Sequence, residues 1–145
     1  MDTTAICLDT GPLIAYLKGR EPGATAVARV VQEHTCYVTA ITAYELLFGV
    51  ARAKKEIGED ALLGILNVLP FDSQAARNAA TLHVHLITQN LDIGVKDTFI
   101  AAICLAHQLP ILTLNERHFS RVPKLRVITP EIVIASQDCY IQSSV

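Results

Sequence analysis

Short apolar runs alternate with segments of helical periodicity along this 145-residue chain. The apolar runs are bounded by turn or capping residues and predict buried strands at 6–9, 36–39, 68–71, 111–114 and 126–128. The periodic segments predict helices over 12–17, 24–33, 42–55, 59–66, 73–89 and 95–107, with a short one opening at Pro130. This alternation predicts an α/β fold with a mostly parallel sheet of four or five strands.

The length and composition predict one domain. Apolar residues make up 51% of the chain and charged residues 18%, which suffices for a sizeable core. We expect the domain to span residues 1–135 and leave the tail, 136–145, unassigned. No apolar run approaches ~18 uncharged residues, so no membrane span is expected. The N-terminus lacks a basic segment, so a secretory signal is not expected.

Four cysteines stand apart from one another, at positions 7, 36, 104 and 139, and none forms a C-x-x-C pair. Three of them lie inside apolar runs, where cysteine behaves as a small hydrophobe. Buried free thiols are therefore favoured over a zinc site or a disulfide framework. We expect the protein to reside in a reducing cytoplasm.

Asp9 is the single charge in the twelve-residue stretch ICLDTGPLIAYL. It closes the first predicted strand, and parallel sheets bind ligands outside the carboxyl ends of their strands. Its side chain is therefore expected at the mouth of a crevice. The same rule draws attention to TLNE, residues 113–116, at the end of the fourth predicted strand.

Two further carboxylates are isolated in apolar sequence. Glu45 is the one charge between Val38 and Ala51, and no basic residue lies three or four positions from it. An ionised carboxylate in such surroundings must pair, bind a cation or have its pKa raised. Asp97 lies in the first turn of its predicted helix, where it could instead interact with the helix dipole.

Three carboxylates in three apolar segments together indicate an acidic cluster that holds hard divalent cations. Mg²⁺ and Mn²⁺ prefer oxygen ligands. Such ions can activate water and stabilise the leaving oxygen of a phosphodiester. The net charge of −2 argues against a strongly basic nucleic-acid coat, but it does not exclude a nuclease whose carboxylates bind metal.

The chain resembles the PIN-domain family, and within it the VapC-like toxin ribonucleases of toxin–antitoxin pairs. The segments that carry the resemblance are LDTGPLIAYL, TAYELLFGV, IGVKDTFIAAICLAHQLPILTLNERHF and RVPKLRVITP. It implies a three-layer α/β/α sandwich and an endoribonuclease that depends on Mg²⁺ or Mn²⁺, with Asp9, Glu45 and Asp97 as the catalytic, metal-binding acids. It also implies an RNA substrate, a homodimer and a VapB-like antitoxin.

The resemblance assigns supporting roles to Thr10, beside the site, and to Thr113, which helps to hold it. Many PIN domains carry a fourth acid two residues after that threonine. Here Asn115 takes the place, and an amide binds metal through its carbonyl oxygen without adding charge. Glu116 follows and is a second candidate ligand. With this set, one ion would bind firmly and another would arrive only with substrate phosphate.

Basic residues cluster just past the predicted site, between Arg117 and Arg126. We take Lys96, Arg117 and Arg121 as candidates for RNA binding. The basic stretch could instead meet acidic segments of a partner, and the other alternative for each residue is a solvated side chain. The histidines are scattered, so no histidine metal site is expected.

Other functions fit the chain less well. A Rossmann nucleotide binder would need G-x-G-x-x-G after the first strand, where this chain offers only Gly11. A phosphatase with Asp9 as nucleophile would usually carry a second aspartate at position 11. Two alternatives stay open: a nuclease of the same fold that acts on DNA, and a non-catalytic interaction module.

Overall fold

The computed structural model describes residues 4–136, in which five parallel strands form one sheet of order β3-β2-β1-β4-β5. The strands are β1 (Ala5–Leu8), β2 (Thr35–Thr39), β3 (Asn67–Leu69), β4 (Ile111–Leu112) and β5 (Val127–Ile128). The helices are α1 (Thr10–Lys18), α2 (Gly23–Glu33), α3 (Ala40–Ala53), α4 (Glu59–Gly64), α5 (Ser73–Thr88), α6 (Val95–Ala106), α7 (Glu116–Phe119) and α8 (Pro130–Ala135).

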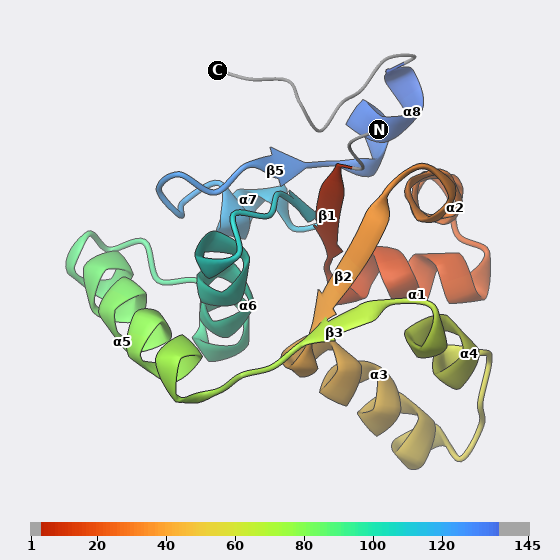
Figure 1. The fold of residues 1–145 in the computed structure, drawn as a ribbon, viewed down its shortest axis with the longest axis horizontal. Helices are drawn as coiled ribbons and strands as arrows, with labels where there is room; N and C mark the ends of the chain where they lie inside the picture. The colour runs from red at the N-terminus through yellow and green to blue at the C-terminus, as the bar shows by residue number, and fades with distance from the viewer. Residues whose placement is uncertain (1–3, 137–145) are drawn as a thin grey trace.

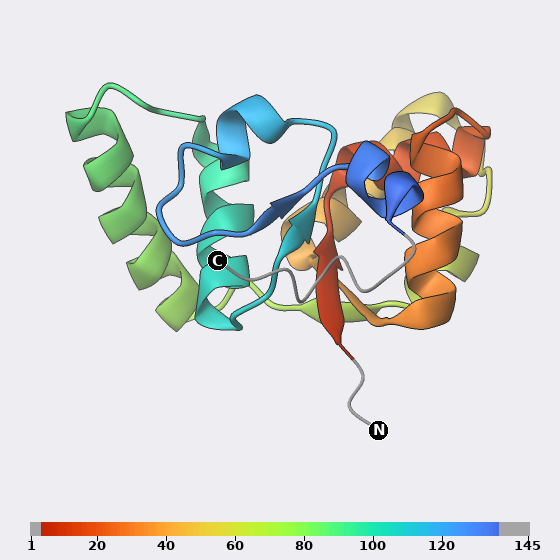
Figure 2. The same ribbon diagram turned by 90° about the horizontal axis from the view of Figure 1, so that it is seen from above.

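Helices cover both faces of the sheet, so the predicted three-layer α/β/α sandwich is confirmed (Figures 1 and 2). One core cluster joins the sheet to α1, α2, α4 and α8, and includes Leu8, Leu13, Val27 and Val133. The other joins it to α5, α6 and α7, and includes Leu86, Ile100 and Phe119. The near-continuous apolar character of β1 follows from this, because a strand buried on both faces has no solvent side.

The sequence placed most elements within a few residues but overextended some strands. β4 ends at Leu112 and not at the predicted 114, and β3 ends at Leu69 and not at the predicted 71. β1 ends at Leu8, and Asp9 is the N-cap of α1. The four-residue helix α7 was not predicted, because one turn is too short to show a period.

Three of the cysteines confirm the buried-thiol prediction. Cys7, Cys36 and Cys104 are free and buried. Cys139 and the predicted tail beyond Ser136 lie outside the described residues. Within residues 4–136, none of the helices is long and apolar enough to cross a bilayer.

Candidate active site

Asp9 lies at the point where the strand order reverses, between β1 and β4. Both strands run parallel with Leu8 opposite Leu112, so the next residues, Asp9 and Thr113, leave the sheet side by side. The Thr113 hydroxyl donates to Oδ2 of Asp9 at 2.8 Å, and both residues are buried. This is the crevice position where open parallel sheets bind ligands.

Burial raises the pKa of the Asp9 carboxyl from its ordinary 3.8 to about 6. Hydrogen bonds from the Thr113 hydroxyl and the Thr10 backbone oppose the rise, whereas the charges of Asp97 and Glu45 add to it. Asp97 and Glu45 therefore both lie within electrostatic range of Asp9. An added cation would favour the ionised form of Asp9.

Glu45 is presented by α3, whose first turn is capped by the Thr39 side chain accepting from the backbone N–H of Thr42. The Thr10 hydroxyl donates to Oε1 of Glu45 at 2.7 Å. Lys96 Nζ lies 3.3 Å from Oε2 of the same carboxylate. The charge partner that Glu45 lacks along its own helix thus comes from α6.

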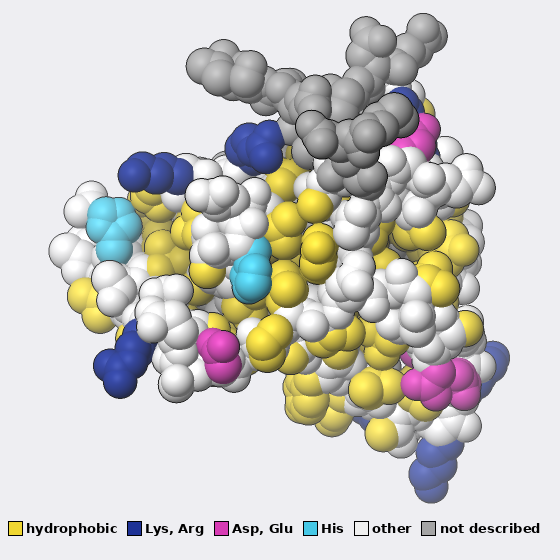
Figure 3. All heavy atoms as spheres, viewed as in Figure 1, with side chains coloured by type: hydrophobic (Ala, Val, Ile, Leu, Met, Phe, Trp, Pro, Cys, Tyr) yellow, Lys and Arg dark blue, Asp and Glu magenta, His cyan; other side chains and the backbone are white. Residues whose placement is uncertain are grey.

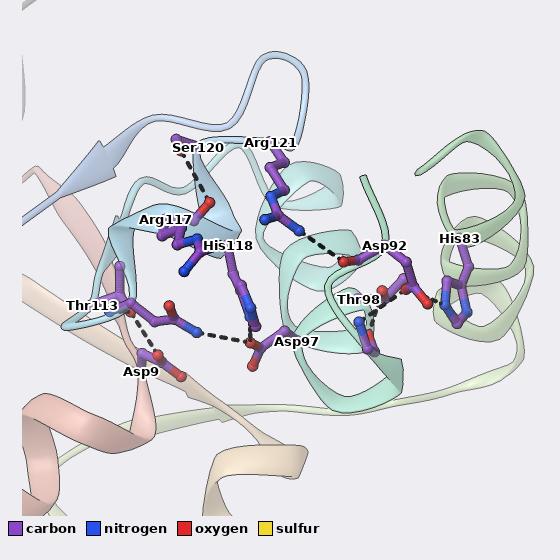
Figure 4. Close-up of polar contacts among 12 residues, drawn as sticks. Asp9, His83, Asp92, Asp97, Thr98, Thr113, Arg117, His118, Ser120 and Arg121 are labelled. Carbon is purple, nitrogen blue, oxygen red and sulfur yellow. Dashed lines mark hydrogen bonds and ion pairs between the residues drawn. The ribbon is translucent and has the colours of Figure 1, made fainter. Parts of the chain in front are cut away.

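Asp97 is presented by the first turn of α6. That helix starts after Gly94, whose φ of 90° lies in the left-handed region that favours glycine. The Thr98 hydroxyl donates to the Gly94 carbonyl at 2.6 Å and closes the turn. Two donors reach Oδ2 of Asp97: Asn115 Nδ2 at 3.3 Å and His118 Nδ1 at 3.0 Å (Figure 4).

The donor set suits a hard divalent cation. Asp9, Glu45 and Asp97 come from three separate elements at the carboxyl edge of the sheet and supply only carboxylate oxygens. Within residues 4–136, no three Asp, Glu, His or Cys side chains are already gathered into a coordination cluster. Each acid is instead held by a donor from another element. Asp9, buried and with a raised pKa, is the member whose ionised form most needs a positive partner.

The remaining predicted residues fall into two groups. Thr10, Thr113, Asn115 and Lys96 all bond one of the three acids. In the second group, Arg121 donates to the backbone carbonyl of Asp92 at 2.9 Å, and Glu116 and Arg117 lie on α7 with exposed side chains.

His118 is the site residue that sequence reasoning missed. In the sequence it is one of five scattered histidines, yet it contacts Asp97 directly. A usable signal was its spacing of three from Asn115, because residues three apart lie on one side of a helical turn.

Comparison with known proteins finds relatives over most of the chain. Residues 6–125 match the model of the PIN domain family. A ribonuclease VapC from Rickettsia bellii is 31% identical over 131 residues, which cover 86% of this chain and 95% of that protein. Among the solved structures that share the fold are two VapBC proteins. VapBC2 from Rickettsia felis, bound to a promoter DNA fragment, has a TM-score of 0.76 at 23% identity and covers 87% of this chain and 98% of that one.

The second is VapBC-1 from nontypeable Haemophilus influenzae, with a TM-score of 0.73 at 25% identity. It covers 88% of this chain and 99% of that chain. The alignments cover at least 95% of each of these relatives. The family match over residues 6–125 includes all three acids. The chain therefore belongs to the PIN-domain family, within its VapC branch.

Proposed function

We propose that this protein is a metal-dependent endoribonuclease and the toxin of a toxin–antitoxin pair. The observation that carries the proposal is the convergence of Asp9, Glu45 and Asp97 on one edge of the sheet, in a chain of the VapC branch. The name of the Rickettsia bellii relative, a ribonuclease, supports RNA as the substrate.

In this proposal, Asp9, Glu45 and Asp97 hold Mg²⁺ or Mn²⁺. A divalent cation bound there supplies activation of water and stabilisation of the leaving oxygen of a phosphodiester. The chain's own residues prepare the site: Thr113 orients Asp9, and Thr10 orients Glu45. Asn115 and Glu116 stay candidates for further ligands.

Cations at the rim would meet the RNA backbone. Lys96 has a side chain that is 61% exposed although it pairs with Glu45, so its ammonium can reach both the site and solvent. Arg117 is exposed on α7. Phosphate contacts of this kind position a nucleic acid without reading its sequence. Arg121 is the weakest of the three RNA-binding candidates, because its guanidinium binds the Asp92 carbonyl.

The test is cleavage of structured RNA by the purified protein with Mn²⁺, with EDTA, and with Asp97→Asn alongside. Asparagine keeps the shape of Asp97 and removes its charge. We expect cleavage to vanish with EDTA and to fall by at least ~100-fold in the variant, the order of loss seen when one key electrostatic group is removed. Asp60→Asn, at an exposed position of α4, is the matched control.

Three outcomes would contradict parts of the proposal. Wild-type rates from Asp97→Asn would refute the assignment of the metal site. Cleavage of single-stranded DNA in place of RNA would favour the DNA-acting alternative. Mn²⁺ binding that is absent by calorimetry, together with intact RNA, would favour the non-catalytic interaction module.

A VapB-like antitoxin is the partner that we propose, by analogy with the VapBC complex from Haemophilus influenzae. A trough beside the site, lined by both apolar and charged side chains, suits such a partner. It consists of two cavities of about 490 and 610 Å³ that share Leu17 and Ile57, between α1, α3 and α4. Glu45 lines the first cavity, so a peptide in the trough would reach this member of the site. Ile57→Glu should weaken inhibition by the antitoxin and leave RNA cleavage by the free toxin unchanged.

A homodimer is the second assembly that we propose. α3 exposes three large apolar side chains at positions i, i+3 and i+4: Tyr44 at 58%, Leu47 at 44% and Phe48 at 49%. Figure 3 shows hydrophobic side chains at the surface over α3 with few charged side chains among them. Contiguous apolar surface of this kind marks protein contacts. The buried free thiols of Cys7, Cys36 and Cys104 support our proposal that these assemblies form in a reducing cytoplasm.

A further inference from the structure

His118 makes a contact that the proposed function does not use. Its Nδ1 lies 3.0 Å from Oδ2 of Asp97, and the side chain reaches down to that carboxylate from α7 (Figure 4). A carboxylate accepts hydrogen bonds but donates none when ionised, so this ring nitrogen must carry the hydrogen.

The fold holds α7 firmly against the start of α6. Phe119, next to His118, is completely buried in the core. The backbone N–H groups of His118 and Phe119 both donate to the Asn115 carbonyl, which closes the turn. Arg121 then binds the backbone carbonyl of Asp92, in the loop that leads into α6. The contacts of the residues before and after His118 thus fix its position. Burial of its own ring does not, because that side chain is 37% exposed.

Both donors on Asp97 select the same oxygen. His118 and Asn115 contact Oδ2, which leaves Oδ1 outside these two bonds. A carboxylate held in one orientation loses less conformational freedom on binding a cation. Partners of this kind behind metal ligands typically change metal affinity by about 10–100-fold when removed.

We propose that His118 is a positioning residue for Asp97: it holds the carboxylate so that Oδ1 is presented to the cation. The inference rests on the proposed function, because it assumes that Asp97 is a metal ligand. His118 itself touches neither the cation nor the RNA in this role.

The experiment compares three substitutions at position 118. His118→Asn keeps a donor, because the asparagine amide nitrogen lies about where Nδ1 of histidine lies. His118→Leu removes the donor and keeps a side chain of similar size. His118→Gln places its amide nitrogen near the position of Nε2 and away from that of Nδ1. It serves as a polar variant that lacks the donor if leucine impairs folding. His85→Leu, at an exposed position of α5, is the matched control.

Mn²⁺ affinity by titration calorimetry is the first measurement. We expect His118→Leu and His118→Gln to bind Mn²⁺ at least about 10-fold more weakly, and His118→Asn to stay within about 3-fold of the wild type. Cleavage kinetics are the second: at saturating Mn²⁺, the KM for RNA should stay unchanged in all three variants.

Wild-type Mn²⁺ affinity in His118→Leu would overturn the inference, and so would equal weakening by Asn and Leu. Failure of the proposed function looks different. A wild type that binds Mn²⁺ through Asp97 but cuts no RNA would contradict the ribonuclease and leave the affinity comparison valid. A wild type that binds no Mn²⁺ would overturn both.

Discussion

The hydroxyl of Thr113 is bonded to Oδ2 of Asp9 at 2.8 Å, across the place where the order of the strands reverses. The same hydroxyl oxygen accepts the backbone N–H of Asn115 at 2.8 Å. One buried side chain thus connects the acid after β1 to the chain that leads into α7. Removing the Thr113 hydroxyl should therefore disturb both Asp9 and the chain that leads into α7.

Thr113→Val keeps the shape of the side chain and removes its hydroxyl. We expect it to lower the free energy of unfolding by about 1.5–3 kcal/mol at pH 8, because a buried carboxylate loses a charge-assisted hydrogen bond. Thr113→Ser keeps the hydroxyl and should lose much less. Urea unfolding of the metal-free protein measures both, and an unchanged free energy of unfolding in Thr113→Val would show that the bond does not stabilise the fold.

Asp9 makes the metal-free protein less stable as the pH rises. Its pKa is raised from 3.8 to about 6, chiefly by burial, so the folded state binds more protons than the unfolded state between these values. The contribution of Asp9 to the free energy of unfolding is therefore fully present below pH 4 and is lost as the pH rises through about 6. A rise of about two pKa units corresponds to an upper bound of roughly 3 kcal/mol.

Asp9→Asn removes the buried charge and should raise the free energy of unfolding at pH 8, by up to about 2 kcal/mol, with little change at pH 4. Urea unfolding at the two pH values gives the difference. Mn²⁺ should stabilise the wild type at pH 8 and not the variant. A variant that is less stable than the wild type at pH 8 without metal would refute the assignment of a raised pKa.

The sequence located the three acids because their positions follow from local rules. Asp9 terminates a buried strand, Asp97 opens a helix, and the carboxyl ends of parallel strands share one edge. Glu45 stood out because its apolar helix offered it no partner. These features depend on the order of elements along the chain and hardly on how the helices pack.

The partners of the acids depend on packing between distant segments and were not predictable in the same way. Lys96 reaches Glu45 only because α6 lies beside α3. His118 lies on a helix of four residues, which leaves no periodic trace in the sequence. The basic residues past the site were therefore interpreted as one stretch, although Arg121 and His118 bind the protein and Arg117 faces solvent.

Lys96→Gln separates two roles of this lysine. The ammonium neutralises part of the charge on Glu45, so its loss should raise Mn²⁺ affinity about two- to threefold at low ionic strength. The KM for RNA should rise, because a cation at the rim is lost. Stability should hardly change, since exposed pairs contribute at most about 1 kcal/mol. Lys54→Gln, on an exposed lysine at the end of α3, is the control. Mn²⁺ affinity that falls in Lys96→Gln would contradict the first role.

Phe48→Glu tests the homodimer. The exposed face of α3 carries Tyr44, Leu47 and Phe48, and the rings of Tyr44 and Phe48 lie 5.8 Å apart, so the two aromatics form one contact surface. A charge placed among them would be buried without a partner in a dimer but would stay hydrated in a monomer. Sedimentation velocity should therefore show a dimer for the wild type and a monomer for Phe48→Glu, with unchanged circular dichroism.

Ile65→Glu, which places the same charge on the exposed apolar residue after α4, should leave the dimer intact. A dimer that survives Phe48→Glu would move the interface away from α3, and a monomeric wild type would refute the assembly itself.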